Sequence, residues 1–309
     1  MNVTIVLSSY NGEKYIAQQI DSIRQQTYQD WTLLIRDDGS SDRTPQIITD
    51  YCQQDSRIQF INADNRQNLG VIKSFYHLVK HQESDYYFFA DQDDIWLPEK
   101  IAVTLACAES ESSDQPLLVY TDLKVVDEEL QVLHESMIRT QSHHANTTLL
   151  QELTENTVTG GTMMINQSLA NLWLVTDELL MHDWYLALIA AAMGKLIYID
   201  QPTQLYRQHS NNVLGARTLS KRMKNWVRPH RLIAKYWWLI TSSQKQARQL
   251  LKLELPAQKR QLIQAYIGLL DSPFSERLRV LKHYGFSKNR AFHTLVFMTL
   301  MVTKIGYKE

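Results

Sequence analysis

The first two thirds of the chain alternate short apolar runs with longer segments in which apolar residues recur at helical spacing. The apolar runs predict strands at residues 3–8, 31–36, 57–62, 86–90, 117–121, 162–166 and 196–199. The segments between them predict helices at residues 13–26, 44–54, 70–82, 98–109, 167–176 and 183–193. This alternation is typical of an α/β fold, in which a mostly parallel sheet has helices on both faces.

The apolar run at residues 86–90 stops abruptly at three carboxylates, Asp91, Asp93 and Asp94. Like charges so close together raise one another's pKa unless a cation neutralises them. Carboxylate oxygens select Mg²⁺ or Mn²⁺, and Mg²⁺ takes most of its other ligands from water and substrate phosphates. This strand end therefore indicates a site for a metal-bound diphosphate. The alternative is an acidic loop at the start of a helix, since Pro98 follows.

Two other predicted strands also end in polar residues. The second strand leads into Asp37 and Asp38, and the first leads into Ser9 and Asn11. Ligands of open α/β sheets bind outside the carboxyl ends of the strands, so these ends would form one polar rim. Ordinary turn chemistry accounts for single Ser and Asn residues better than for paired acids at two strand ends. Thr44 is the expected N-cap of the helix that follows.

Several segments together resemble a known family: Ser8-Ser9-Tyr10-Asn11, residues 37–42, Asn68-Leu69-Gly70 and Asp91-Gln92-Asp93-Asp94. In order and spacing they resemble the family 2 glycosyltransferases with the GT-A fold. Thr159-Gly160-Gly161-Thr162, His182-Asp183-Trp184 and residues 206–212 extend the resemblance to about residue 215. The form Asp-Gln-Asp-Asp-Ile-Trp is similar to that of bacterial rhamnosyltransferases that build cell-wall polysaccharides.

The resemblance implies a role for each matching residue. Asp93 and His209 would bind Mn²⁺ or Mg²⁺, and Asp183 would be the general base that deprotonates the acceptor hydroxyl. Arg207 would bind the diphosphate, and Trp184 would pack against the sugar or the core. The other implied substrate-binding residues are Ser9, Asn11, Asp37, Asp38, Asn68, Gly70, Asp91, Gly160 and Gly161. A capped turn is the alternative for Asn68-Leu69-Gly70, and the absence of the family's Gln-x-x-Arg-Trp sequence argues against a processive synthase.

The resemblance further implies a metal-dependent, inverting transferase. We expect it to move L-rhamnose from dTDP-rhamnose, its nucleotide-sugar donor, to a lipid-linked saccharide acceptor in cell-wall or surface polysaccharide synthesis. One alternative is a donor with another sugar, such as a UDP-linked hexose. Another is a non-catalytic, membrane-bound scaffold with the same fold.

Composition narrows the remaining function classes. The chain is 44% hydrophobic and 21% charged, as in globular proteins with a sizeable core. Its cysteines are Cys52 and Cys107, without zinc spacing, which favours reduced thiols and a cytoplasmic location. A Gly-x-Gly-x-x-Gly sequence after the first strand and a P-loop are both absent, which disfavours dinucleotide oxidoreductases and P-loop NTPases. We expect neither a signal peptide nor a membrane-spanning run.

Charge is distributed very unevenly along the chain. Residues 217–309 contain 19 Lys and Arg against 4 Asp and Glu, a balance of +15. Residues 1–216 contain 13 Lys and Arg against 29 Asp and Glu, a balance of −16. This contrast predicts a catalytic domain over residues 1–216 and a basic C-terminal region over residues 217–309. Helical patterns divided by Pro256 and Pro273 predict three or four helices in that region.

The basic region also carries Trp226, Trp237 and Trp238 among its cations. Interleaved cations and aromatics suit nucleic acid, but amphipathic rings favour the headgroup level of an anionic membrane, so we expect no nucleic acid. The protein would then lie peripherally at the inner face of the cell membrane. Residues 292–302 are apolar but too few to span a bilayer, and a buried helix or a homo-oligomer contact is favoured over membrane insertion as their explanation.

Overall fold

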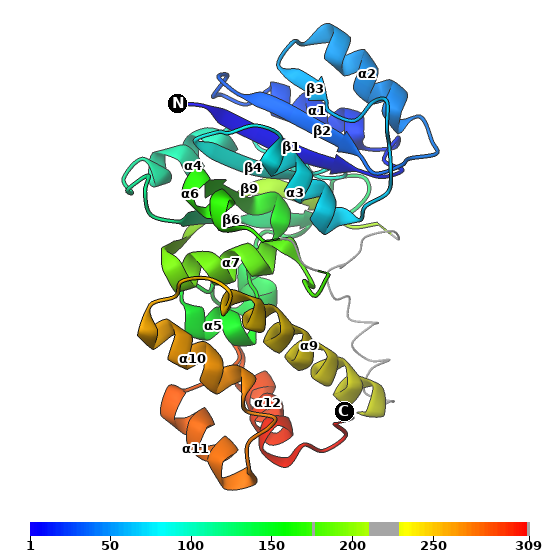
Figure 1. The fold of residues 1–309 in the computed structure, drawn as a ribbon. Helices are drawn as coiled ribbons and strands as arrows, with labels where there is room; N and C mark the ends of the chain where they lie inside the picture. Colours follow the sequence, from blue (N-terminus) through cyan, green and yellow to red (C-terminus); the bar gives the residue numbers. More distant parts are fainter. Residues whose placement is uncertain (175–176, 210–228, 308–309) are drawn as a thin grey trace.

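A computed structural model describes residues 1–174, 177–209 and 229–307 of the chain. The described residues form a nine-stranded sheet in the order β3-β2-β1-β4-β8-β6-β9-β5, with β7 paired to β6 (Figure 1). The strands are β1 Val3–Ser9, β2 Thr32–Asp37, β3 Ile58–Phe60, β4 Tyr86–Asp91, β5 Ile95–Trp96, β6 Leu117–Val126, β7 Val132–His134, β8 Met163–Asn166 and β9 Lys195–Arg207.

The sheet is mostly parallel, as the alternation predicted. Strands β3, β2, β1 and β4 lie side by side in that order, and each pair among them is parallel. Strand β8 is antiparallel to both β4 and β6, so β6 runs in the direction of β4, and β9 is parallel to β6. The short strands β5 and β7 are antiparallel to their partners. The expected α/β fold is therefore confirmed.

Helices cover both faces because successive side chains of a strand point to opposite sides. Ile5 and Phe88 pack with α1 (Ile16–Arg24), α2 (Thr44–Gln54) and α4 (Lys100–Ala108). Val6 and Phe89 pack on the other side with α3 (Val71–His81), α6 (Gln167–Leu172) and α7 (His182–Met193). The central strands are buried on both sides, which explains why most of their residues are apolar.

The predicted boundaries were wrong for the two longest strands. Strand β6 continues past residue 121 to Val126, and β9 continues past residue 199 to Arg207. Asp200 and Pro202 are residues typical of a turn, but β9 does not end there. Instead, the register of β9 against β6 shifts at this point. A bulge accommodates a proline within a ladder, so pairing resumes beyond it.

Short elements escaped prediction as well. Strands β5 and β7, the π-helix η1 (Ile138–Ser142) and helix α5 (Leu149–Thr154) occur in segments without clear periodicity. Thr44 is not the N-cap of α2, because Arg43 occupies that position. Instead, the carboxylate of Asp42 accepts the Thr44 N–H at 3.0 Å. The side chain of Asp42, two residues before Thr44, thus takes the capping role that was expected of Thr44.

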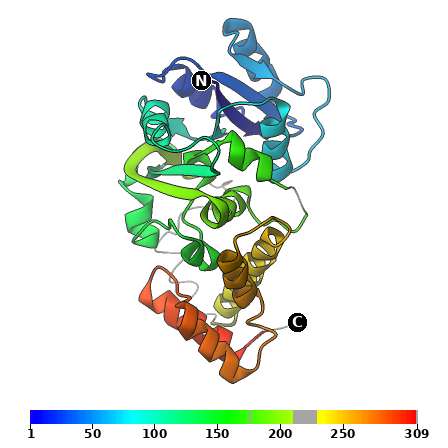
Figure 2. The same cartoon turned by 60° about the vertical axis from the view of Figure 1, so that its left-hand side comes forward.

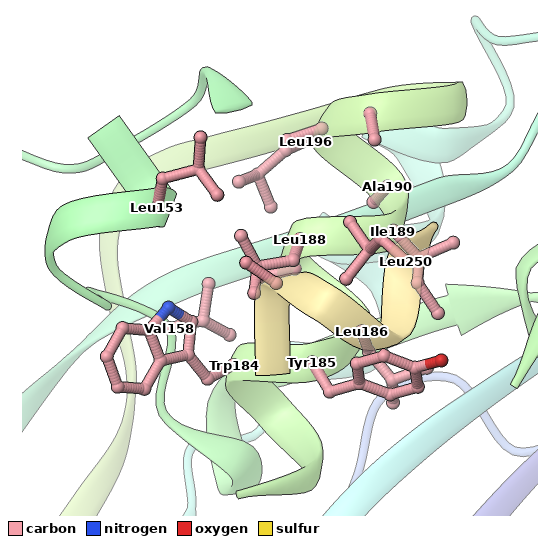
Figure 3. Packing of buried hydrophobic residues seen from close by; sticks show 14 of the residues in the cluster. Leu153, Val158, Trp184, Tyr185, Leu186, Leu188, Ile189, Ala190, Leu196 and Leu250 are labelled. Atoms are coloured by element: carbon pink, nitrogen blue, oxygen red, sulfur yellow. The ribbon is translucent and has the colours of Figure 1, made fainter. Parts of the chain in front are cut away.

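The C-terminal region folds into four described helices, α9 Pro229–Leu250, α10 Ala257–Ile267, α11 Phe274–Tyr284 and α12 Ala291–Thr303. They lie on the α7 side of the sheet and share one hydrophobic cluster with α5 and α7 (Figures 1, 2 and 3). None of the described helices is both long and apolar enough to cross a bilayer. The expected boundary near residue 216, the residues 210–212 and Trp226 lie outside the described residues.

Candidate active site

The polar strand ends meet at one edge of the sheet, as their positions predicted. Strand β1 lies between β2 and β4, with Ser9 opposite Asp37 and Ser8 opposite Asp91. The carboxyl ends of these parallel strands are therefore neighbours, and the 3₁₀ turn η2 (Gly160–Thr162) packs against the end of β4. This edge is the candidate active site.

The carboxylates after β4 lie in a confined environment. Asp94 is buried and accepts hydrogen bonds from Gln204 Nε2 at 2.8 Å and from the Arg207 backbone N–H at 3.2 Å. A Cβ on Gly161 would lie 3.1 Å from Asp91 Oδ2 and 3.2 Å from Asp94 Oδ2. Burial, reinforced by the charge of Asp93, raises the pKa of Asp91 to about 7. Because Gly161 has no side chain, the backbone of η2 can lie close to Asp91 and Asp94, two carboxylates that repel each other.

The structure brings together the two residues expected to bind metal. His209 Nε2 lies 2.7 Å from Asp93 Oδ2, and the His209 ring stacks on Tyr15 with 5.2 Å between centroids. No group of three or more His, Cys, Asp or Glu with a metal-binding arrangement occurs among the described residues. Mg²⁺ and Mn²⁺ accept such an open site, because water and phosphate oxygens complete their coordination. The Asp93 carboxylate therefore fits either cation, and the His209 imidazole fits Mn²⁺ better than Mg²⁺, which prefers oxygen ligands.

Arg207 lies beside Asp93 and His209, and its guanidinium is bound to other protein groups. Its Nε donates to the Asp93 carbonyl at 3.1 Å, its Nη1 to the Glu128 carbonyl at 2.7 Å and its Nη2 to Gln18 Oε1 at 2.6 Å. The guanidinium also lies over the Tyr15 ring at 4.5 Å. These contacts fix the backbone that carries Asp93, in addition to the expected role toward a phosphate.

Asp183 is held at the start of α7, one residue after the first helical position, with Met181 as the N-cap residue. Its Oδ2 accepts the Gly160 N–H at 3.1 Å, and its Oδ1 accepts the Trp184 N–H at 2.5 Å. Burial raises the pKa of Asp183 to about 7. The charge of Asp183 also raises the pKa of Asp91, so the two carboxylates are close enough to repel each other. A carboxylate with this pKa can take a proton near neutral pH.

The two neighbours of Asp183 are buried. Trp184 lies in the apolar cluster around α7, and its Nε1 donates to the Glu152 carbonyl at 2.8 Å (Figure 3). Trp184 was expected to pack against either the sugar or the core, and in the structure it packs in the core. His182 stacks on Phe75 with 4.5 Å between centroids, and burial lowers its pKa to about 3.

The residues expected around the nucleotide form a hydrogen-bonded rim. Asp37 accepts the hydroxyl of Ser9 at 3.2 Å and the Ser40 N–H at 2.9 Å. Asn11 Oδ1 accepts the Ser41 N–H at 2.9 Å. These bonds join the loop after β1 to the loop after β2, so the rim is rigid before any ligand arrives.

Asp38 organises the entry to α3. It accepts hydrogen bonds from Arg36 at 2.6 Å, from the Leu69 N–H at 2.7 Å and from the Gly70 N–H at 2.9 Å. Gly70 has a φ of 79°, a left-handed conformation that glycine adopts without strain. The turn expected as the alternative for this segment is present, and Asn68 remains exposed beside it.

Two residues of the site were missed from the sequence, Lys100 and Gln204. Lys100 lies in a helical segment, where a lysine is usually solvated, but here it is buried. Gln204 lies in the part of β9 beyond its predicted end. No local pattern marks either residue, because Gln204 reaches the site through the pairing of β9 with β5 and β6 and only there meets Lys100 of α4.

Comparison with known proteins places this geometry in a family. The sequence model described as Glycosyl transferase family 2 matches residues 4–173. RfbG, a dTDP-rhamnosyl transferase of Shigella flexneri, is 30% identical over 224 residues, which are 68% of this chain and 74% of that protein. WfgD of Escherichia coli, a UDP-Glc:alpha-D-GlcNAc-diphosphoundecaprenol beta-1,3-glucosyltransferase, is 34% identical over 104 residues, 34% of this chain and 40% of that protein.

Solved structures with the same fold are more distant in sequence. TarS 1–349 of S. aureus in complex with UDP-GlcNAc is 17% identical, with a TM-score of 0.61 over 92% of this chain and 80% of that chain. The mannosyltransferase PcManGT of Pyrobaculum calidifontis in complex with GDP-Man and Mn²⁺ is 11% identical, with a TM-score of 0.52 over 99% of this chain and 81% of that chain. These likenesses confirm the expected GT-A fold.

Proposed function

The chain belongs to glycosyltransferase family 2, and from this membership we propose that it is a metal-dependent, inverting rhamnosyltransferase that uses dTDP-rhamnose. The observation that carries the choice of donor is the 30% identity to a dTDP-rhamnosyl transferase over two thirds of the chain. The three carboxylates at the end of β4, of which Asp94 is buried, and the raised pKa of Asp183 support the reaction class. The acceptor that we propose is a lipid-linked saccharide.

In the proposed reaction, Asp183 is the general base. The acceptor hydroxyl transfers its proton to the Asp183 carboxylate while its oxygen bonds to C1 of the sugar. The bond between C1 and the diphosphate oxygen breaks, and the electron pair leaves with the nucleoside diphosphate. Because the attack comes from the face opposite to the leaving group, the anomeric configuration inverts. A pKa of about 7 keeps Asp183 partly ionised and basic at neutral pH.

Asp93 and His209 would hold the divalent cation in this proposal. A bound cation supplies Lewis-acid stabilisation of the charge that develops on the leaving diphosphate. The chain itself brings the carboxylate and the imidazole together at 2.7 Å and fixes the Asp93 backbone through Arg207. The rigid rim of Ser9, Asn11 and Asp37 would position the base and ribose of the nucleotide.

The C-terminal helices would bring the enzyme to the inner face of the cell membrane. Trp238 on α9 and Leu295 on α12 are exposed by 51% and 65%. The two helices are joined where Tyr236 bonds His293 and where Trp237 Nε1 donates to the Ile305 carbonyl at 2.9 Å. Trp237 is therefore buried, with its indole against the segment that follows α12. Exposed apolar side chains in a region of net charge +15 suit an anionic lipid surface. The alternative is that these side chains form a contact between subunits of a homo-oligomer.

A donor panel tests the proposal. The purified enzyme is incubated with Mn²⁺ and with dTDP-rhamnose, UDP-glucose or UDP-GlcNAc, with GlcNAc-diphosphoundecaprenol as the acceptor. Extension of the lipid acceptor and release of dTDP are measured by mass spectrometry and chromatography. We expect turnover with dTDP-rhamnose and at most background with the UDP sugars.

A UDP-linked hexose is the second candidate donor. The identity to WfgD and the fold shared with TarS in complex with UDP-GlcNAc favour it. Turnover with a UDP sugar alone would establish this candidate in place of rhamnose. Absence of turnover together with no thermal shift from dTDP, UDP or Mn²⁺ would instead support the non-catalytic scaffold.

A further inference from the structure

Lys100 is a fully buried lysine at the first position of α4, and only 1% of its surface is exposed. Its Nζ donates to the Gly161 carbonyl at 2.5 Å and to Gln204 Oε1 at 2.6 Å. The ammonium also lies 4.6 Å from the centroid of the Trp96 ring, within the range of a cation–π contact. All three directions of the ammonium are thus used inside the protein, at a site where an unpaired charge would be very costly.

One of these contacts leads to the donor side of the active site. Because Lys100 is a donor only, it binds the oxygen of the Gln204 amide and turns the amide nitrogen toward Asp94. That nitrogen donates to Asp94 Oδ2 at 2.8 Å. Without the lysine, either end of the amide could face Asp94, and the oxygen end would repel the carboxylate. Lys100 therefore determines the orientation of the group that binds Asp94.

The other contact leads to the acceptor side. Lys100 holds the carbonyl of Gly161 in η2, and the adjacent residue Gly160 donates its N–H to Asp183 Oδ2 at 3.1 Å. A Cβ on Gly161 would lie 2.9 Å from Gln204 Nε2, so the turn and the Gln204 amide are packed directly against each other. The η2 turn thus connects the lysine to the carboxylate that we propose as the base.

We propose that Lys100 is a positioning residue that holds the donor-side carboxylates and the Asp183 base in one fixed arrangement. It acts through Gln204 on Asp94 and through the η2 turn on Asp183, and it touches neither substrate. The inference rests on the proposed role of Asp183. A fixed arrangement matters because a displacement of about 1 Å at a reacting group costs about 10²-fold in rate.

Lys100→Met tests this role, because methionine keeps the length of the side chain and removes the ammonium. With whichever nucleotide sugar the wild type turns over, we expect kcat to fall about 10²-fold while KM for the donor changes by less than about threefold. Gln204→Leu should lower kcat about tenfold, because it removes only the route to Asp94, and the double variant should be no worse than Lys100→Met, since the orientation of Gln204 depends on Lys100. Lys195→Met, which removes a surface lysine paired with Glu111, is the matched control and should leave kcat unchanged.

A readout independent of turnover is the hydrogen exchange of the Gly160 amide, measured by NMR. Lys100→Met should accelerate this exchange about tenfold or more while the amides of β1 keep their protection. Lys100→Arg, which retains the charge, should restore part of both kcat and protection. Wild-type kcat and an unchanged Gly160 exchange rate in Lys100→Met would overturn the proposal.

Two other results also decide the matter. A general loss of protection across β1, with kcat falling only in proportion to the folded fraction, would reduce Lys100 to a structural lysine and overturn the proposal. Should Lys100→Met not fold, Gln204→Leu decides, because it keeps the lysine and removes the contact to Asp94. If the wild type turned over no donor, the proposed function would fail, and the exchange rate of Gly160 would still test the connection from Lys100 to the turn.

Discussion

His209 Nε2 lies 2.7 Å from Asp93 Oδ2, although 116 positions separate the two residues in the chain. The contact exists because β9 runs along β6 as far as Arg207 and delivers His209 to the loop after β4. A carboxylate and an imidazole held side by side offer two ligands to one divalent cation. The pair is therefore the part of the site where the proposed metal dependence can be tested most directly.

Asp93→Asn and His209→Gln should each weaken Mn²⁺ binding in the presence of the nucleotide about 10–100-fold, because each removes a proposed ligand. Binding is measured by the electron paramagnetic resonance signal of free Mn²⁺. His144→Gln, a change at an exposed histidine, is the control. Unchanged Mn²⁺ binding in both variants at the pair would refute the metal assignment.

Asp183→Asn should lower kcat about 10²–10⁴-fold with little change in donor affinity, because the amide cannot take the acceptor proton. In the wild type, only the ionised carboxylate is active, and burial raises its pKa to about 7. The kcat should therefore rise with pH through about 7 and level off above it. A wild-type profile that is flat from pH 5 to 9 would contradict this assignment.

The same burial makes a prediction for stability. In the unfolded chain Asp183 ionises near its ordinary pKa of 3.8, whereas in the folded protein it ionises near 7. The contribution of this group to stability is therefore lost as pH rises from about 4 to about 7. Asp183→Asn should unfold at a higher temperature than the wild type at pH 8 and show a smaller difference at pH 4.5, as measured by calorimetry. An equal difference at both pH values would show that ionisation is not the cause.

Gly161→Ala should lower kcat about tenfold or more, because its Cβ would press on Gln204, Asp91 and Asp94. Gly268→Ala is the matched control, since its Cβ would approach only the Gln264 carbonyl, in the C-terminal region. Both variants should retain the circular dichroism of the wild type. Full activity of Gly161→Ala in the steady-state assay would mean that the close approach of η2 to the carboxylates is not needed.

Glu152→Gln should stabilise the protein at pH 8. Glu152 is fully buried, and burial raises its pKa well above the ordinary value of 4.5. The unfolded chain ionises this acid as pH rises past 4.5 while the folded protein keeps it protonated, so stability is lost over that range. The neutral amide of Glu152→Gln removes this loss of stability. The unfolding temperatures of the variant and the wild type at pH 4.5 and pH 8 measure the effect. A variant less stable than the wild type at pH 8 would contradict the argument.

The membrane proposal predicts flotation with anionic liposomes and loss of flotation as salt rises, because the attraction acts within about 8 Å at physiological ionic strength. Trp238→Ser with Leu295→Ser should abolish flotation, since both apolar side chains are exposed. Leu133→Ser, on the exposed strand β7, is the control. Absence of wild-type flotation, together with an oligomer that dissociates in high salt, would favour the subunit contact.

Local features made the fold class and the centre of the site predictable from the sequence. A strand buried on both faces is a nearly continuous apolar run, so β1, β2 and β4 were recognisable. Their polar ends follow immediately in the chain, which is why Asp37 and Asp91 were expected at one edge. The family resemblance singled out Asp183 because its motif is also local.

The amino-acid sequence by itself thus determined the strand–helix alternation, the acids at the strand ends and the basic C-terminal region. Only the tertiary structure decided which polar side chains meet and which aromatic side chains are buried. Lys100 reads as a surface lysine until the extended β9 places Gln204 beside it. The sequence alone suggests that Trp237 is a membrane anchor, but in the structure the segment after α12 covers it, through Ile305 and Tyr307. Burial and pairing of this kind arise from contacts between segments that are distant in the chain. Local periodicity cannot predict such contacts, because it depends only on neighbouring residues.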